Sequence, residues 1–107
     1  MKVADIDWDE GNWPKCGGHG VSQVEIERLF RSSPSVYADP THFRDEQRLR
    51  AIGRTAGGRW LFVAFTLRQR DGKTFVRPVS ARYMHRKEVS AYARLKDAEK
   101  DAGSPDR

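Results

Sequence analysis

Residues 60–83 read WLFVAFTLRQRDGKTFVRPVSARY and contain the clearest structural pattern in the chain. Apolar side chains occupy both alternating faces of residues 61–67, which predicts a strand at the centre of a sheet, covered on both sides. Asp71-Gly72 is a typical two-residue turn between antiparallel strands. Residues 73–83 form the returning strand, where Pro78 cannot donate a hydrogen bond and therefore indicates an edge or a bulge.

A helix is predicted upstream of this hairpin, over VSQVEIERLFRSS at residues 21–33. Ser22 and Glu25 have the spacing of a capping box, and Val21 and Ile26 have that of a hydrophobic staple. Pro34 ends the helix. The expected core face consists of the larger apolar residues of the segment, Val24, Ile26, Leu29 and Phe30.

The remaining segments complete an α+β pattern. Residues 3–8 and 48–56 predict strands, residues 35–40 an extended piece, and residues 11–20 a loop with at most one helical turn. From His85 onward the apolar spacing of Val89, Tyr92 and Ala93 is helical. We therefore expect a small antiparallel meander flanked by helices, in one domain over residues 1–95, with a charged, frayed tail over 96–107.

Composition limits the class of protein. The chain has 107 residues, a net charge of +5 and a sequence pI near 9.7, which suggests an anionic partner such as nucleic acid or an acidic protein. Its single cysteine excludes an internal disulfide and fits a reducing compartment. No signal pattern or apolar run of about 18 residues is present, so we expect a soluble, cytoplasmic protein without membrane association.

The stretch KCGGHG at residues 15–20 raises the question of a ligand site. Cys16 and His19 have the spacing of two zinc ligands, but no second pair lies at a suitable distance, so no metal site is expected. The glycines would let backbone N–H groups approach an anion, yet no nucleotide-binding motif is present and no cofactor is expected. His19, His42 and His85 are candidate acid–base groups, because an ordinary histidine titrates near neutrality.

Arginines gather at the ends of the predicted strands. Arg48, Arg50 and Arg54 fall on one face of a regular strand, and Arg82 is followed closely by His85 and Arg86. Guanidinium groups match phosphate oxygens in a fork geometry, although arginines on an exposed sheet also serve solubility alone.

A series of short motifs runs in order from residue 8 to residue 92. They are W-D-E at 8–10, H-G-V-S at 19–22, D-P-x-H-x-x-x-E-x-R at 39–48, I-G-R at 52–54, G-R at 58–59, V-S-A-R at 79–82, R-x-E at 86–88 and a tyrosine at 92. In this order the chain resembles the BrnT-type toxins, the ribonucleases of bacterial type II toxin–antitoxin systems. Gly18 stands where such toxins usually carry a lysine before H-G, and Tyr83-Met84-His85 stands where R-A-T is commoner.

The resemblance implies a fold similar to RelE-like ribonucleases and a metal-independent cleavage of RNA that inhibits translation and growth. It also implies neutralisation by a BrnA-like antitoxin with a ribbon-helix-helix part, through which the complex would contact operator DNA. A non-catalytic basic module that docks an acidic partner or nucleic acid is the alternative, and a DNA-binding regulator is a third class.

Metal-free cleavage needs a base, an acid and cations around the phosphate. We expect His19 or His85 to be the base or acid, with Glu46 a less favoured base. Arg54 and Arg82 would clamp the phosphate. The resemblance motivates His19, Arg48, Arg54 and Arg82, whereas His85 and Lys15 are chosen for their chemistry and neighbourhood. The further phosphate-binding candidates are Lys15, Arg48, Arg50 and Arg86.

Overall fold

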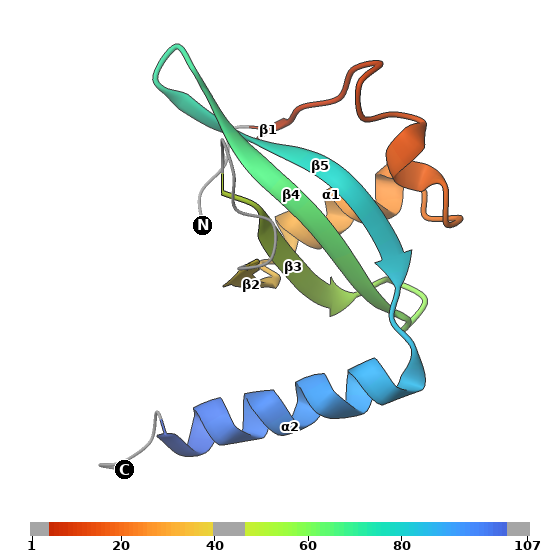
Figure 1. Ribbon diagram of the computed structural model, residues 1–107, viewed down its shortest axis with the longest axis vertical. Helices are drawn as coiled ribbons and strands as arrows, with labels where there is room; N and C mark the ends of the chain where they lie inside the picture. The colour runs from red at the N-terminus through yellow and green to blue at the C-terminus, as the bar shows by residue number, and fades with distance from the viewer. Residues whose placement is uncertain (1–4, 40–46, 103–107) are drawn as a thin grey trace.

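The computed structural model describes residues 5–39 and 47–102, with side chains up to residue 97. Within these ranges a five-stranded sheet and two α-helices form the α+β fold that the sequence predicts (Figure 1). The elements are β1 (Asp5–Ile6), the short 3₁₀ helix η1 (Lys15–Gly17), α1 (Gln23–Arg31), β2 (Ser35–Ala38), β3 (Leu49–Arg54), β4 (Trp60–Arg70), β5 (Lys73–Tyr83) and α2 (Arg86–Ala102).

The strand order is β1-β5-β4-β3-β2. Strands β2 to β5 follow one another as the predicted antiparallel meander, with β4 at the centre. Strand β1 departs from that meander, because it lies parallel to β5, with Asp5 opposite Phe75. The meander is therefore extended by one short parallel strand at the edge of the sheet.

The β4–β5 hairpin has a regular turn and one irregularity. Asp71 and Gly72 both have positive φ, at 51° and 77°, as a turn between right-twisted antiparallel strands requires. Farther along, Phe65 pairs with Pro78 while Ala64 pairs with Ser80, so Val79 is an extra residue in β5. This bulge fits Pro78, which has no N–H to donate to the ladder.

The bulge exchanges the two faces of β5 beyond residue 79, because side chains alternate along a strand and one extra residue reverses the alternation. Tyr83 therefore pairs with Leu61, whose side chain is fully buried, and Arg82 pairs with Phe62. Tyr83 points to the face of the sheet that α1 covers, and Arg82 to the opposite face.

Helix α1 closes the main core against the sheet. Its capping box is present as predicted: the Ser22 hydroxyl accepts the Glu25 N–H, and the Glu25 carboxylate accepts the Ser22 N–H. Val21 and Ile26 are almost fully buried, and the Phe30 ring meets the Phe65 ring edge-on at 4.9 Å. Each such buried side chain stabilises the fold by roughly 1.5–3 kcal/mol.

Val24 was wrongly expected in the core, since 56% of its surface is exposed. Two residues along a helix correspond to about 200° of rotation, so Val24 lies on the side opposite Ile26. The same geometry places Leu29 and Phe30, three and four residues after Ile26, on the buried side.

Helix α2 leaves the end of β5 and runs beyond the body of the sheet (Figure 1). Tyr92 is its anchor: the ring contacts those of Tyr37 and Trp60, and the hydroxyl donates to the Ser35 hydroxyl at 2.7 Å. The helix continues to Ala102, so the first part of the predicted tail is helical. Neither described helix is long and apolar enough to cross a membrane.

Gly53 permits the close approach of α1 to β3. A Cβ at this position would lie 2.5 Å from Leu29 Cδ1, well inside van der Waals contact. A Cβ at Gly57, in the turn between β3 and β4, would have the Thr55 hydroxyl at 3.8 Å as its nearest neighbour. Only the first glycine is required by packing.

We expect Gly53→Ala to lower the free energy of unfolding by about 1–3 kcal/mol, because the added methyl group overpacks the helix–sheet contact. Gly57→Ala is the matched control and should change it by less than about 1 kcal/mol. Urea unfolding measures both. In a Leu29→Ala background the cost of Gly53→Ala should shrink, and an unchanged cost there would contradict the assigned contact.

Candidate active site

A pocket of about 340 Å³ lies at the end of β5, where three separate segments of the chain meet. Basic and aromatic side chains and one methionine line this histidine pocket: His19, Arg59, Arg82, Tyr83, Met84 and His85. None of these described lining residues is acidic, so the pocket suits an anion. Two guanidinium groups beside two imidazoles can bind a phosphate and exchange protons with it.

The loop that carries His19 is anchored on both sides. Before it, Cys16 is 1% exposed and the Trp13 ring lies against Gly17, where a Cβ would come within 2.6 Å of the indole. After it, Gly20 adopts a φ of +88°, which favours glycine, and leads into the capped start of α1. His19 is therefore an exposed side chain on a loop with fixed ends.

Cys16 serves the core. Burial raises the pKa of its thiol to about 11, so the thiol stays protonated at neutral pH. Within residues 5–39 and 47–102, no three His, Cys, Asp or Glu side chains are grouped so as to hold a metal ion. The KCGG segment therefore anchors the loop through the buried Cys16, whereas Lys15 and His19 are exposed.

Arg82 is oriented by a carboxylate from α2. Its two terminal nitrogens donate to the two carboxylate oxygens of Glu88 at 2.7 and 2.8 Å, and its guanidinium lies 4.6 Å from the Phe62 ring centroid. These hydrogen bonds raise the pKa of Arg82 further above its ordinary value. Glu88 also accepts the His85 backbone N–H at 2.9 Å, which fixes the junction between β5 and α2.

Tyr83 connects the pocket to α1. Its hydroxyl donates to Glu25 Oε1 at 2.7 Å, and the Arg59 guanidinium stacks 3.5 Å from its ring centroid. The hydrogen bond to Glu25, together with burial, raises the pKa of Tyr83. Burial alone would raise the pKa of Glu25, but the hydrogen bonds from Tyr83 and Ser22 outweigh it and lower the pKa.

Three of the predicted site residues meet in this pocket, namely His19, Arg82 and His85. Arg59 and Tyr83 join them, although neither was predicted to have a role. Pairing residues outward from the Asp71-Gly72 turn places Arg59 close to the end of β5. The sequence of the hairpin could therefore have predicted that Arg59 lies beside Arg82 and His85. The face that Tyr83 occupies depended on the bulge.

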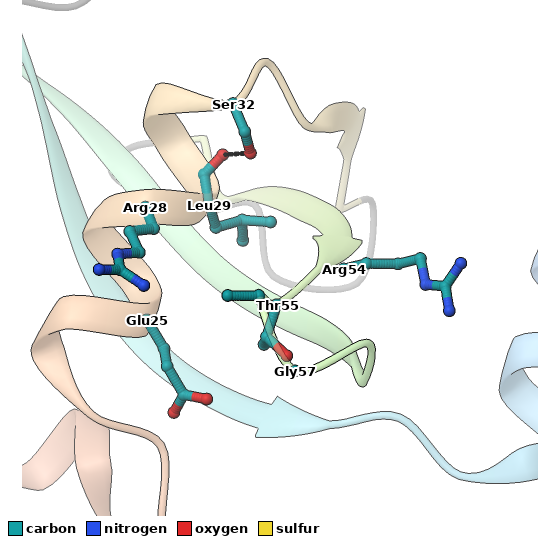
Figure 2. A pocket seen from close by; sticks show the side chains of 8 residues that line it. Glu25, Arg28, Leu29, Ser32, Arg54, Thr55 and Gly57 are labelled. Carbon is teal, nitrogen blue, oxygen red and sulfur yellow. Dashed lines mark hydrogen bonds between the residues drawn. The ribbon is translucent and has the colours of Figure 1, made fainter.

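The other predicted phosphate-binding residues lie outside the pocket lining. Arg54 points away from α1 (Figure 2), donates to the Gly58 carbonyl at 3.3 Å and lies 5.5 Å from the Trp60 ring centroid. Arg50 donates to Asp39 at 3.2 Å. Lys15 and Arg86 are exposed at the surface, and Arg48, which precedes β3, is half-buried. Glu46 and His42 fall outside the described residues.

Trp8 and Trp13 anchor this region. The Trp8 indole N–H donates to Glu27 Oε2 at 2.9 Å, and the two rings meet edge-on at 5.2 Å. Both pack against the core cluster. These contacts tie the segment before His19 to α1.

The ion pair of Glu88 with Arg82 should make the free energy of unfolding fall as the solution becomes acidic. The hydrogen bonds from Arg82 and from the His85 N–H lower the pKa of Glu88 from 4.5 to about 2. Because the folded-state pKa is depressed, the stabilisation is complete above about pH 4.5 and disappears as the pH falls towards 2. Both side chains are 36% exposed, so solvent screening limits the effect at neutral pH to about 1 kcal/mol.

We expect Glu88→Gln to be less stable than the parent at pH 7 by about 1 kcal/mol and to approach it near pH 2.5. Asp97→Asn, an exposed neutralisation on the same helix, is the control. Urea titrations at pH 7, 4 and 2.5 measure the differences. A gap between Glu88→Gln and the parent that stays constant over this range would contradict the role of the carboxylate.

Comparison with known proteins identifies the family of the chain. No curated protein sequence matches the chain. The family model of BrnT, the ribonuclease toxin of a type II toxin–antitoxin system, matches residues 8–88. This range contains the loop of His19, both strands of the central hairpin and Glu88, and it spans most of the chain. The chain belongs to the BrnT family of ribonuclease toxins of type II toxin–antitoxin systems.

Proposed function

We propose that the histidine pocket cleaves RNA without a metal ion, by attack of a ribose 2′-oxygen on the adjacent phosphorus. One observation carries the proposal: two imidazoles and two guanidinium groups line a single pocket in a member of a ribonuclease toxin family. Imidazoles move protons near neutrality, and guanidinium groups stabilise charge on phosphate oxygens.

The reaction needs two proton transfers. A base removes the proton of the 2′-OH while the O2′–P bond forms, and an acid gives a proton to O5′ while the P–O5′ bond breaks. The products are a 2′,3′-cyclic phosphate and a 5′-hydroxyl. His19 and His85 come from separate segments, so they can act as base and acid on different sides of the phosphate. Glu46 is the less favoured base.

Arg82 and Arg59 supply positive charge where the phosphorane gains negative charge. A guanidinium has five N–H donors, and the Glu88 carboxylate takes two of those of Arg82. Further donors of Arg82 therefore remain for a phosphate oxygen, in a side chain that Glu88 already orients. Arg54 lies on the same sheet face as Arg82 and belongs to the outer cations that attract the RNA strand, with Lys15, Arg48, Arg50 and Arg86.

The proposal extends to the partner. Membership in a type II toxin–antitoxin family implies an antitoxin. We infer a BrnA-like protein with a ribbon-helix-helix part, which makes the contact to operator DNA. An acidic segment of this antitoxin would neutralise a pocket lined by cations. Because the substrate and this partner are cytoplasmic molecules, the toxin acts in the cytoplasm.

We expect the purified, antitoxin-free protein to cleave a defined RNA in excess EDTA and to leave 2′,3′-cyclic ends. His19→Ala and His85→Ala should each lower the rate by roughly 10²–10⁴-fold, as loss of acid–base catalysis does. Arg82→Ala should lower it by roughly 10²–10³-fold. Arg94→Ala, an exposed arginine on α2, should retain the parental rate. End-labelled fragments resolved on gels give the rates and the termini.

Intact RNA after incubation with folded protein would overturn this proposal and favour the non-catalytic docking module. Cleavage that EDTA abolishes would contradict metal independence alone. Binding of operator DNA by this chain without the antitoxin, weakening steeply with salt, would favour a regulator. Circular dichroism of each variant establishes that a lost rate does not come from unfolding.

A further inference from the structure

A second pocket, of about 390 Å³, lies between α1 and the turn that joins β3 to β4 (Figure 2). Helix α1 forms one wall of this turn pocket and the turn forms the other. The residues that matter here are Glu25, Arg28 and Leu29 from the helix, and Thr55, Ala56 and Gly57 from the turn. Its volume can hold one nucleobase, and its walls combine apolar and hydrogen-bonding groups as base-binding sites do.

A single hydrogen bond joins the two pockets. Glu25 lines the turn pocket, Tyr83 lines the histidine pocket, and the Tyr83 hydroxyl donates to Glu25 Oε1 at 2.7 Å. Arg59 follows the turn in sequence and stacks on Tyr83. An RNA strand with its scissile phosphate in the histidine pocket can therefore extend past this contact towards the turn pocket.

The hydrogen-bonding groups of the turn pocket already have some of their partners within the protein. Three bonds, from the Ser22 N–H, the Ser22 hydroxyl and the Tyr83 hydroxyl, converge on Glu25 Oε1. Within the part of the chain that the structure describes, no hydrogen bond reaches Glu25 Oε2. The Thr55 hydroxyl oxygen accepts the Arg59 N–H at 3.2 Å, so its own proton points elsewhere and can be donated. Glu25 thus offers a fixed acceptor and Thr55 a hydroxyl donor, in a lining that also includes Ser32 and the guanidinium groups of Arg28 and Arg54.

We propose that the turn pocket binds a guanine next to the cleaved bond, with Glu25 Oε2 accepting its N1–H and N2–H and the Thr55 hydroxyl donating to O6. Guanine is the RNA base that presents two adjacent N–H donors beside an acceptor on its Watson–Crick edge. The exposed Ala56 and the methyl group of Thr55 supply apolar surface for the ring, since Leu29 itself is almost fully buried, and the exposed Arg28 is a cation for a flanking phosphate. The proposal deepens the ribonuclease function proposed above and rests on it.

Adenine and cytosine present only one amino group beside a ring acceptor, so that acceptor would face the Glu25 carboxylate. Uracil has a single N–H between two carbonyls. Since the carboxylate is ionised at neutral pH, each of these edges leaves a repulsive or unpaired contact. A mismatched base edge typically costs about 1–3 kcal/mol, or roughly 5- to 150-fold in affinity.

The first experiment measures base binding without cleavage. Guanosine 5′-monophosphate, the three other ribonucleotides and inorganic phosphate are titrated into the ¹⁵N-labelled protein. We expect the amide signals of Thr55, Ala56 and Gly57 to respond to the guanine nucleotide, with an affinity at least about tenfold above the others. Equal affinities, or shifts confined to the histidine pocket as with phosphate alone, would overturn the proposal.

The second experiment uses Glu25→Gln, which replaces the carboxylate acceptor by an amide yet retains a residue that completes the capping box. Glu27→Gln is the matched control, because it removes the same charge from the same helix outside the turn pocket and keeps an amide oxygen that can accept the Trp8 indole N–H. In a randomised RNA pool, the parent and Glu27→Gln should cut with guanine at one fixed position relative to the bond. Glu25→Gln should lose that preference by about tenfold or more.

An unchanged guanine preference in Glu25→Gln would overturn the assignment. A parent that cuts the pool with no base preference would do the same. The two proposals fail separately: if the parent leaves RNA intact, the ribonuclease proposal falls, and the nucleotide titration alone then decides whether the turn pocket binds guanine.

Discussion

The register of β4 against β5 is the constraint on which the rest of the molecule depends. The Asp71-Gly72 turn sets the pairing and the extra residue at Val79 shifts it by one, so the last residues of β5 exchange faces. Without that shift, Arg82 would point into the core beneath α1 and Tyr83 would point to the opposite face. Instead, the tyrosine reaches Glu25 and the arginine reaches Glu88. A missing N–H at Pro78 thereby helps to assemble a pocket several residues away.

Cationic side chains line the histidine pocket, and the carboxylates that hydrogen-bond to its lining residues lie outside the lining. Glu88 holds Arg82 from α2, and Glu25 holds Tyr83 from α1, so each helix orients one residue of the lining. Neither carboxylate lines the histidine pocket. The arrangement lowers the conformational freedom of the two side chains before any ligand arrives, which is the basis of preorganised electrostatic stabilisation. Because Glu88 belongs to α2, a shift of this helix would also reorient the Arg82 guanidinium.

Local signals in the sequence predicted much of the fold, because they depend on residues that are neighbours along the chain. The capping box at Ser22 and the Asp71-Gly72 turn are of this kind. Arg59 was missed, and the face of Tyr83 was not anticipated, because both depend on how two strands align around a bulge. Arg54 was placed in the site because the resemblance motivates it. A motif shared along the sequence does not determine how far apart two side chains lie along and across the strands.

Glu25 illustrates how one side chain can tie folding to recognition. The same oxygen that completes the N-terminal cap of α1 also accepts the tyrosine hydroxyl, and the residue lines the turn pocket. Substitutions that retune the pocket at this position therefore also alter the start of a helix that carries much of the core. In the proposed base site, a change of base preference is therefore less costly at the turn residues than at residue 25.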